Sequence, residues 1–150
     1  MLTVPSIEAL AGMAGTELPP SEWREVTQTD VDLFADATGD HQWIHVDPDR
    51  AQAGPFGGTI AHGYLTLALV PVLMSTAVKV EGVKMGLNYG LNRVRFPSPV
   101  RVGSRVQAKG VLKEVVAVAG GVQAVFEVTV QAEGAEKPAC VAETVVRYLG

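Results

Sequence analysis

The segment from Gly63 to Val78, GYLTLALVPVLMSTAV, is the most apolar run in the chain and constrains the fold more than any other feature. Apolar side chains would lie on every side of a helix drawn through it, so the run predicts a helix that other elements cover. A membrane span needs about 20 apolar residues, whereas this run is shorter and contains Pro71 near its middle. We therefore expect a central buried helix and no membrane insertion.

Four long segments rich in valine, with partly alternating apolar and polar residues, make up the second half of the chain. They span residues 83–96, 104–118, 121–133 and 139–149, and Gly120-Gly121 marks a hairpin turn. Helices early in the chain and strands late, joined by short turns, predict an α+β domain. Its antiparallel β-sheet should wrap around the long central helix.

Shorter patterns precede the apolar run. Residues 6–14 predict a short helix, and residues 22–27 predict a short strand. A brief helix is expected at 48–53, because Asp47 can accept hydrogen bonds from free amides and Pro48 has no amide to lose at the first helical position. The glycines and proline of residues 54–58 should then end it.

The sequence TDVDLFADATG, residues 29–39, predicts a longer helix ahead of that one. Thr29 can cap its first turn together with Asp32, and Gly39 suits its C-terminal end. Its apolar side would consist of Val31, Leu33 and Phe34. Asp40 is therefore expected to begin a loop.

The composition fits one soluble domain. A chain of 150 residues can bury roughly two-thirds of its unfolded surface. The formal net charge of −4 argues against a nucleic-acid partner, since proteins that bind nucleic acids usually carry a basic stripe.

The cysteine content and the N-terminal sequence indicate where the protein is found. Cys140, the single cysteine, lies among apolar residues, so we expect it to be buried in the core of a protein from a reducing compartment. The N-terminal sequence MLTVPSIEALAGMAG lacks the features of a secretory signal, so we expect a cytoplasmic protein.

A cluster of polar residues between the helix of residues 29–39 and the apolar run is the candidate functional site. The stretch GDHQWIHVDPDRA places Asp40, His41, His45 and Asp47 within a few positions, in a chain with 3 histidines. From the residues alone, His45 can equally be a structural histidine. Asp40, His41 and His45 are also potential metal ligands. A loop that starts at a glycine does not hold the three side chains in a geometry that suits one ion, so no metal is expected.

With Thr38 before it, the stretch reads TGDHQWIHVDPDRA and resembles the signature of the MaoC-like dehydratases and (R)-specific enoyl-CoA hydratases of the hot-dog fold. That signature has Gly-Asp, a variable residue, Asn-Pro, an aliphatic residue and His, followed by Asp-Pro and an alanine. The matching positions are Gly39, Asp40, Ile44, His45, Asp47, Pro48 and Ala51, while Gln42 and Trp43 replace Asn-Pro.

Two further segments extend the resemblance from about residue 25 to the end of the chain. TIAHGYLTLAL contains the His-Gly pair of the family as His62 and Gly63, and VRFPSPVRVGSRV resembles its proline turn, with Ser104 where an acidic residue is common. The resemblance implies a single hot-dog domain over residues 1–150, in which residues 1–20 form an N-terminal extension outside the match.

The implied reaction is the reversible addition of water to a trans-2-enoyl-CoA, which gives an (R)-3-hydroxyacyl-CoA. The resemblance makes Asp40 the base and His45 the partner that orients the water, although which of the two carries the proton stays open. The amide of Gly63 would stabilise the developing oxyanion, since free amides at a helix start favour negative charge. No cofactor is expected, because coenzyme A is part of the substrate.

Three other positions have weaker assignments. Gln42 keeps the amide of the family's asparagine on a longer side chain, and His62 is either a substrate-binding residue or a structural residue at the start of the helix. Arg93 and Arg95 lie on the same face of a strand and either contact the phosphates of coenzyme A or form a solvated edge.

Two other functions remain open, and both keep the fold. A hot-dog thioesterase would usually carry a carboxylate on its central helix, yet residues 63–78 contain no aspartate or glutamate. A non-catalytic acyl-CoA-binding module would explain the departure from Asn-Pro. In each case a homodimer is expected, because a single sheet leaves one edge and one side of an apolar helix uncovered.

Overall fold

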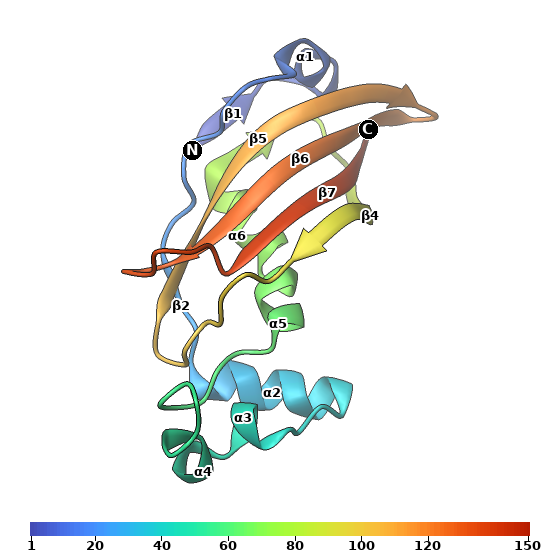
Figure 1. Cartoon of the computed structure of the whole chain (residues 1–150). Helices are drawn as coiled ribbons and strands as arrows, with labels where there is room; N and C mark the ends of the chain where they lie inside the picture. The colour runs from blue at the N-terminus through green and yellow to red at the C-terminus, as the bar shows by residue number, and fades with distance from the viewer.

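The computed structural model describes all 150 residues and has an antiparallel sheet wrapped around a bent central helix (Figure 1). The sheet has five strands in the order β2-β5-β6-β7-β4. Their bounds are Arg24–Glu25 (β2), Met85–Arg95 (β4), Arg105–Val118 (β5), Gly121–Ala132 (β6) and Cys140–Leu149 (β7). All pairs are antiparallel. The expected α+β hot-dog architecture is confirmed.

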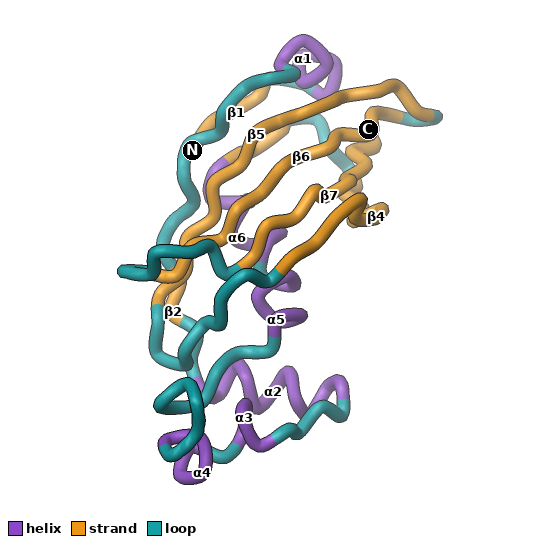
Figure 2. The backbone as a smooth tube through the Cα atoms, in the orientation of Figure 1, coloured by secondary structure: helices purple, strands orange, loops and turns teal.

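The alternating pattern of the long strands sets which side of the sheet faces the helix. On β6, Val122, Ala124, Phe126, Val128 and Val130 belong to the hydrophobic core. Every second residue of a strand points to the same face, so these five residues line the concave face, where the backbone tube passes over the helix (Figure 2). The hairpin between β5 and β6 turns at Gly120, whose φ of 81° is a left-handed value that favours glycine.

The central helix is bent, whereas the sequence predicted one continuous helix. It consists of α5, Gly63–Ala68, and α6, Val70–Ala77, with Leu69 between them. Hydrogen bonds continue across the junction, from the Leu69 amide to the Leu65 carbonyl and from the Leu73 amide to the Leu69 carbonyl, both at 3.0 Å. Pro71 lacks an amide hydrogen to donate, and its ring crowds the preceding turn, which is the usual cause of such a bend.

One side of this helix is uncovered in the single chain, as expected for a helix that only one sheet covers. Leu65, Val70 and Leu73 are buried under the sheet. Tyr64, in contrast, is 72 % exposed, and Val72 is exposed as well. An apolar stripe therefore remains on the solvent side of the helix.

The helix α2, Gln28–Thr38, precedes the site and differs in detail from its prediction. Thr27, and not Thr29, is the N-cap: its backbone is extended, its hydroxyl accepts from the Asp30 amide, and the Asp30 carboxylate accepts from the Thr27 amide. The helix starts earlier than expected because this reciprocal pair satisfies two free amides. Leu33 points to solvent, while Gly39 ends the helix with φ of 83°, as predicted.

Two short helices follow α2 and lie with it below the start of α5 (Figure 1). The helix α4, Pro48–Gln52, begins as predicted, with the Asp47 carboxylate accepting from the Arg50 amide at 3.1 Å. The helix α3, Trp43–Val46, was not predicted, since that stretch was expected to be an irregular loop. His45 therefore lies on a short helix.

The N-terminal residues pack at the other end of the central helix (Figure 1). They form β1, Leu2–Val4, then α1, Ile7–Leu10, and the 3-10 helix Ala11–Met13. β1 runs parallel to β3, Val78–Val80, which directly follows α6. Because Val4 and Leu10 are fully buried in the core, this segment contributes to the packing of the domain.

Cys140 lies on the core face of β7 and is fully buried. Burial raises the pKa of its thiol to about 11, because the thiolate is disfavoured away from water. A thiol of this kind is inert, which agrees with the predicted core role. No helix of the structure is both long enough and apolar enough to cross a membrane.

Candidate active site

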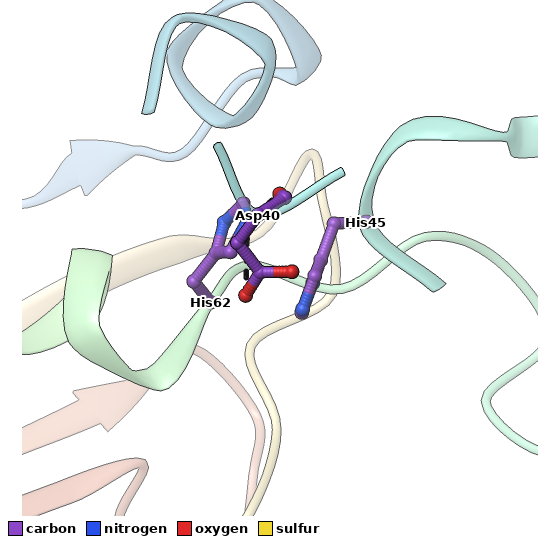
Figure 3. Close-up of side chains that lie close together, drawn as sticks. All are labelled: Asp40, His45 and His62. Atoms are coloured by element: carbon purple, nitrogen blue, oxygen red, sulfur yellow. Dashed lines mark hydrogen bonds and ion pairs between the residues drawn. The ribbon is translucent and has the colours of Figure 1, made fainter. Parts of the chain in front are cut away.

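Asp40, His45 and His62 meet where α2, α3 and α5 come together (Figure 3). One nitrogen of each histidine and one carboxylate oxygen of Asp40 all lie within 4.8 Å of one another. Both histidines are buried, whereas the side chain of Asp40 is 54 % exposed. The site therefore consists of two buried imidazole rings, with the carboxylate of Asp40 between them and solvent.

Asp40 is held by short-range contacts around the end of α2. Its amide donates to the Thr38 hydroxyl, and its Oδ1 accepts from the Gln42 amide, both at 3.3 Å. The carboxylate points toward the two imidazole rings (Figure 3). Gly39 permits this sharp exit from the helix, because its left-handed backbone suits glycine.

His45 is fixed in one tautomer by the segment that precedes α5. Its Nδ1 lies 2.7 Å from the carbonyl oxygen of Ile60. A carbonyl can only accept, so Nδ1 carries the hydrogen and Nε2 has a free lone pair. Burial lowers the pKa of His45, and nearby His62 lowers it further, while the Ile60 carbonyl and Asp40 oppose this shift. His45 is therefore neutral at neutral pH, with a hydrogen-bond acceptor available at Nε2.

His62 joins the other two residues. Its ring stacks on that of His45, with centroids 3.8 Å apart and planes 23° apart. Its Nε2 lies 3.0 Å from the Asp40 carbonyl oxygen and therefore donates to it. His62 makes no side-chain cap to α5, and its Nδ1 is buried without a partner. The hydrogen bond to the Asp40 carbonyl agrees with the structural role considered for His62, in which it bonds to a neighbouring loop.

One nitrogen of His45 and one carboxylate oxygen of Asp40 lie no more than 4.8 Å apart. A water that donates one hydrogen to each of two acceptors spans about 4.6 Å between them, so a separation near this upper limit suits one bridging water. The carboxylate of Asp40 and Nε2 of His45 can both accept. A water held in this way keeps its oxygen lone pairs free to attack a substrate.

The same cluster is poorly arranged for a metal ion. The rings of His45 and His62 are stacked in nearly parallel planes, so the lone pairs of their nitrogens, which lie in those planes, do not converge on one point. Nε2 of His62 also carries the hydrogen that it donates to Asp40. His41, part of the trio considered from sequence, is exposed and pairs instead with Asp36 at 2.8 Å, which raises its pKa.

The other predicted site residues lie around this cluster. Gly63 follows His62 as the first residue of α5, so its amide has no acceptor within the helix. A Cβ at Gly63 would lie 2.9 Å from the ring of Phe96, so packing against Phe96 already requires glycine there.

The two residues that replace Asn-Pro lie beside the cluster. Gln42 is exposed, and only its backbone amide donates to Asp40. Trp43, in place of the proline, packs against Gly54 and under the guanidinium of Arg50.

Arg93 and Arg95 share one face of β4, as predicted, and both are exposed. Val94 between them packs against the core, so the two arginines point to the outer face of the sheet. Arg95 adjoins Phe96, the residue that contacts the Gly63 position. Arg95 is thus next in sequence to a residue beside the site, and both arginines lie outside the three-residue cluster.

An apolar cavity of about 660 Å³ lies between the bent helix and the sheet. It begins one turn after Gly63, at Leu67, and continues past Met74 toward Tyr148. The residues of β4 along it are Gly86, Asn88, Gly90 and Leu91, so all but one of them are small or polar. None of Asp40, His45, His62 and Gly63 lines this cavity, which runs along the helix on the side of Leu67 away from the cluster.

Sequence reasoning missed the residues that hold His45 in place: Gln28, Thr59 and Ile60. They belong to α2 and to the segment before α5, far from His45 in sequence. Ile60 acts through its backbone carbonyl, which no sequence pattern reports. Gln28 and Thr59 are ordinary polar residues at helix starts and loops, so nothing marked them before the structure was known.

Comparison with known proteins identifies the family. The model of the MaoC like domain matches residues 10–135. This chain belongs to the MaoC-like domain family. A 3-hydroxyacyl-thioester dehydratase Z from Mycobacterium tuberculosis is 58 % identical over 150 residues, covering 99 % of each chain. An (R)-specific enoyl-CoA hydratase from Rhodospirillum rubrum is 31 % identical over 85 residues, covering 57 % of this chain and 56 % of that protein.

Solved structures agree with this MaoC-like fold. The (R)-hydratase from A. caviae superposes with a TM-score of 0.72 at 23 % sequence identity, covering 90 % of this chain and 96 % of that one. At this identity the likeness concerns the fold alone. The fold, the family and the signature residues Asp40 and His45 are therefore consistent with one another.

Proposed function

We propose that this MaoC-like protein is a hydratase that adds water to trans-2-enoyl-CoA thioesters to give (R)-3-hydroxyacyl-CoA, and that it catalyses the reverse dehydration. The observation that carries the proposal is that two hydrogen-bond acceptors, the Asp40 carboxylate and the free Nε2 of neutral His45, belong to residues of one cluster whose ligand atoms lie within 4.8 Å of one another. The names of its relatives, a dehydratase and a hydratase, support the same reaction.

In this mechanism the Asp40–His45 pair holds the water and takes one of its protons while the water oxygen bonds to C3 of the substrate. A proton returns to C2, so the net change is addition of H and OH across the double bond. Negative charge grows on the thioester oxygen during this step. The free amide of Gly63, at the positive end of the central helix, is placed to stabilise that charge.

The remaining site residues position these groups. His62 holds the Asp40 backbone and supports the face of the His45 ring. The backbone amide of Gln42 orients the Asp40 carboxylate. The exposed side-chain carboxamide of Gln42 is free to contact the thioester. The apolar cavity beyond Leu67 receives the acyl chain. We infer that Arg93 and Arg95, exposed on β4, contact the phosphates of coenzyme A.

Crotonyl-CoA distinguishes this function from the two alternatives. Mixed with the purified protein, it should lose the absorbance of its conjugated thioester without release of free thiol, because hydration removes the double bond and leaves the thioester intact. Release of thiol would instead identify a thioesterase. Unchanged absorbance, with binding of the thioester shown by calorimetry, would identify a binding module.

The activity should fall at acid pH because His45 must be neutral to accept a hydrogen. Its pKa lies below the ordinary 6.5 of histidine, so protonation abolishes the acceptor only as the pH drops through that lowered value. We expect kcat/KM for crotonyl-CoA to be level around neutrality and to decline with a midpoint below 6.5. A decline with a midpoint above 6.5 would contradict the neutral state assigned to His45.

We also propose that two copies pair into a homodimer through β4. This strand is the edge of the sheet, and its Met85, Leu87, Tyr89 and Leu91 are exposed. The uncovered side of the central helix, with Tyr64 and Val72, is also apolar. Exposed apolar edges of this kind mark sites of association.

Light scattering tests the dimer with a matched pair of variants. Leu87 on the edge strand and Val116 on β5 are equally exposed, at 41 % and 40 %. The wild type should have about twice the mass of the 15.8 kDa chain. Leu87→Glu should shift it toward the monomer because it places a charge at the interface, and Val116→Glu should leave it dimeric. A wild type that is monomeric at micromolar concentration would contradict the proposal.

A further inference from the structure

The side chain of Gln28, at the start of α2, uses every polar group of its carboxamide. Its Nε2 donates to the His45 carbonyl at 2.8 Å and to Asp32 Oδ1 at 2.9 Å. Its Oε1 accepts from the Thr59 hydroxyl at 2.6 Å. Gln28 therefore ties α2 to two segments that lie far from it in sequence, and both of these segments hold His45.

The first of these segments is α3. A helix of 4 residues makes too few internal hydrogen bonds to hold its own shape. The carbonyls of its last turn, including that of His45, lack amide donors within the helix. Gln28 supplies a donor to the His45 carbonyl from outside, so it fixes the backbone from which the imidazole extends.

The second segment is the strand-like stretch before α5. Thr59 is buried and precedes Ile60, whose carbonyl accepts from Nδ1 of His45 and whose amide donates to the Ile44 carbonyl at 3.0 Å. Three hydrogen bonds and the peptide bond between Thr59 and Ile60 thus form a closed circuit. It runs from the His45 carbonyl through the side chains of Gln28 and Thr59 to Ile60, and returns to the His45 ring.

We propose that Gln28 and Thr59 are positioning residues for the hydration reaction, which set where Nε2 of His45 lies relative to the Asp40 carboxylate. Neither side chain touches the reacting atoms. The proposal rests on the proposed roles of Asp40 and His45. A shift of about 1 Å in a group that must hold a water in line can cost about 100-fold in rate, so a clamp on both the backbone and the ring of His45 contributes to kcat.

Substitutions of similar size test the clamp. Thr59→Val keeps the volume and removes the hydroxyl, while Thr59→Ser keeps the hydroxyl. Gln28→Glu keeps the acceptor for Thr59 but turns a carboxylate oxygen toward the His45 carbonyl. Asp32→Ala removes the exposed partner of the same carboxamide and serves as the control.

We expect Thr59→Val and Gln28→Glu to lower kcat for crotonyl-CoA hydration by about 10- to 100-fold, with KM changed by less than about threefold because the substrate contacts are intact. Thr59→Ser should restore kcat to near the wild-type value, and Asp32→Ala should leave it unchanged. Melting temperatures measured on the same samples separate a loss of folded protein from a loss of rate.

Two results would overturn the proposal. In the first, Thr59→Val and Gln28→Glu keep wild-type kcat and lose only thermal stability, which makes the circuit purely structural. In the second, Thr59→Ser is as slow as Thr59→Val, which makes the hydroxyl irrelevant. His45→Gln, assayed in parallel, distinguishes failure of the clamp from failure of the site: full activity in that variant would remove the proposed function of His45 itself.

Discussion

Asp40→Asn should lower the rate of crotonyl-CoA hydration by about 10²- to 10⁴-fold, the range expected when a positioned acid or base is lost. Asparagine keeps the shape of the side chain and an oxygen for the Gln42 amide. It lacks the charge and the ability to take a proton. Catalysis is therefore removed while the local structure is kept. Steady-state rates of the two purified proteins measure the effect.

The melting temperature of Asp40→Asn should stay close to that of the wild type, because the side chain is half exposed and makes a single long hydrogen bond. A thioester ligand should still raise the melting temperature, as any ligand of the native state does. Asp36→Asn is the control, since Asp36 is also exposed and lies four positions before Asp40, on α2. If Asp40→Asn retains more than about a tenth of the activity, the carboxylate is no essential base.

His45→Gln should also reduce hydration by about 10²- to 10⁴-fold. Glutamine can still donate to the Ile60 carbonyl, but it offers no imidazole nitrogen to accept a hydrogen from the water. The acid limb of the pH profile should disappear in the residual activity, since the group that titrates is gone. Rates from pH 5 to pH 8 (about the range in which histidines titrate) measure both effects.

His45→Gln should lower the melting temperature as well, in contrast to Asp40→Asn. His45 is buried and stacks on His62, so a non-aromatic side chain loses packing. His41→Gln is the matched control, because His41 is exposed and pairs only with Asp36. An unchanged acid limb in His45→Gln would assign that titration to another group, and loss of activity in His41→Gln would show that the substitution acts nonspecifically.

The sequence was sufficient to predict the strands, because their signal is local. Valine-rich alternation and the Gly120-Gly121 pair depend only on neighbours along the chain, and the four long strands begin and end close to the predicted residues. Gly39 likewise ends α2 through its own left-handed backbone. Asp40 and His45 were found because the family signature lies in one continuous stretch of residues 38–51.

The features that sequence could not supply depend on contacts between distant segments. His45 and His62 are 17 positions apart, and their stacking follows from how α3 docks against the start of α5. The circuit through Gln28 and Thr59 joins three segments. The cap of α2 was misplaced for a local reason: both Thr27-x-x-Asp30 and Thr29-x-x-Asp32 fit a capping pattern, and only the extended backbone at Thr27 decides between them.

The central claim is that Asp40 and His45 hold one water between them, and the double-mutant cycle of Asp40→Asn and His45→Gln tests it most directly. Residues that act as a unit give strongly non-additive losses, because removal of either one already releases the water. We predict that the double variant hydrates crotonyl-CoA at about the rate of the slower single variant. A loss equal to the product of the two single losses would mean that the residues act independently, and it would contradict the shared water.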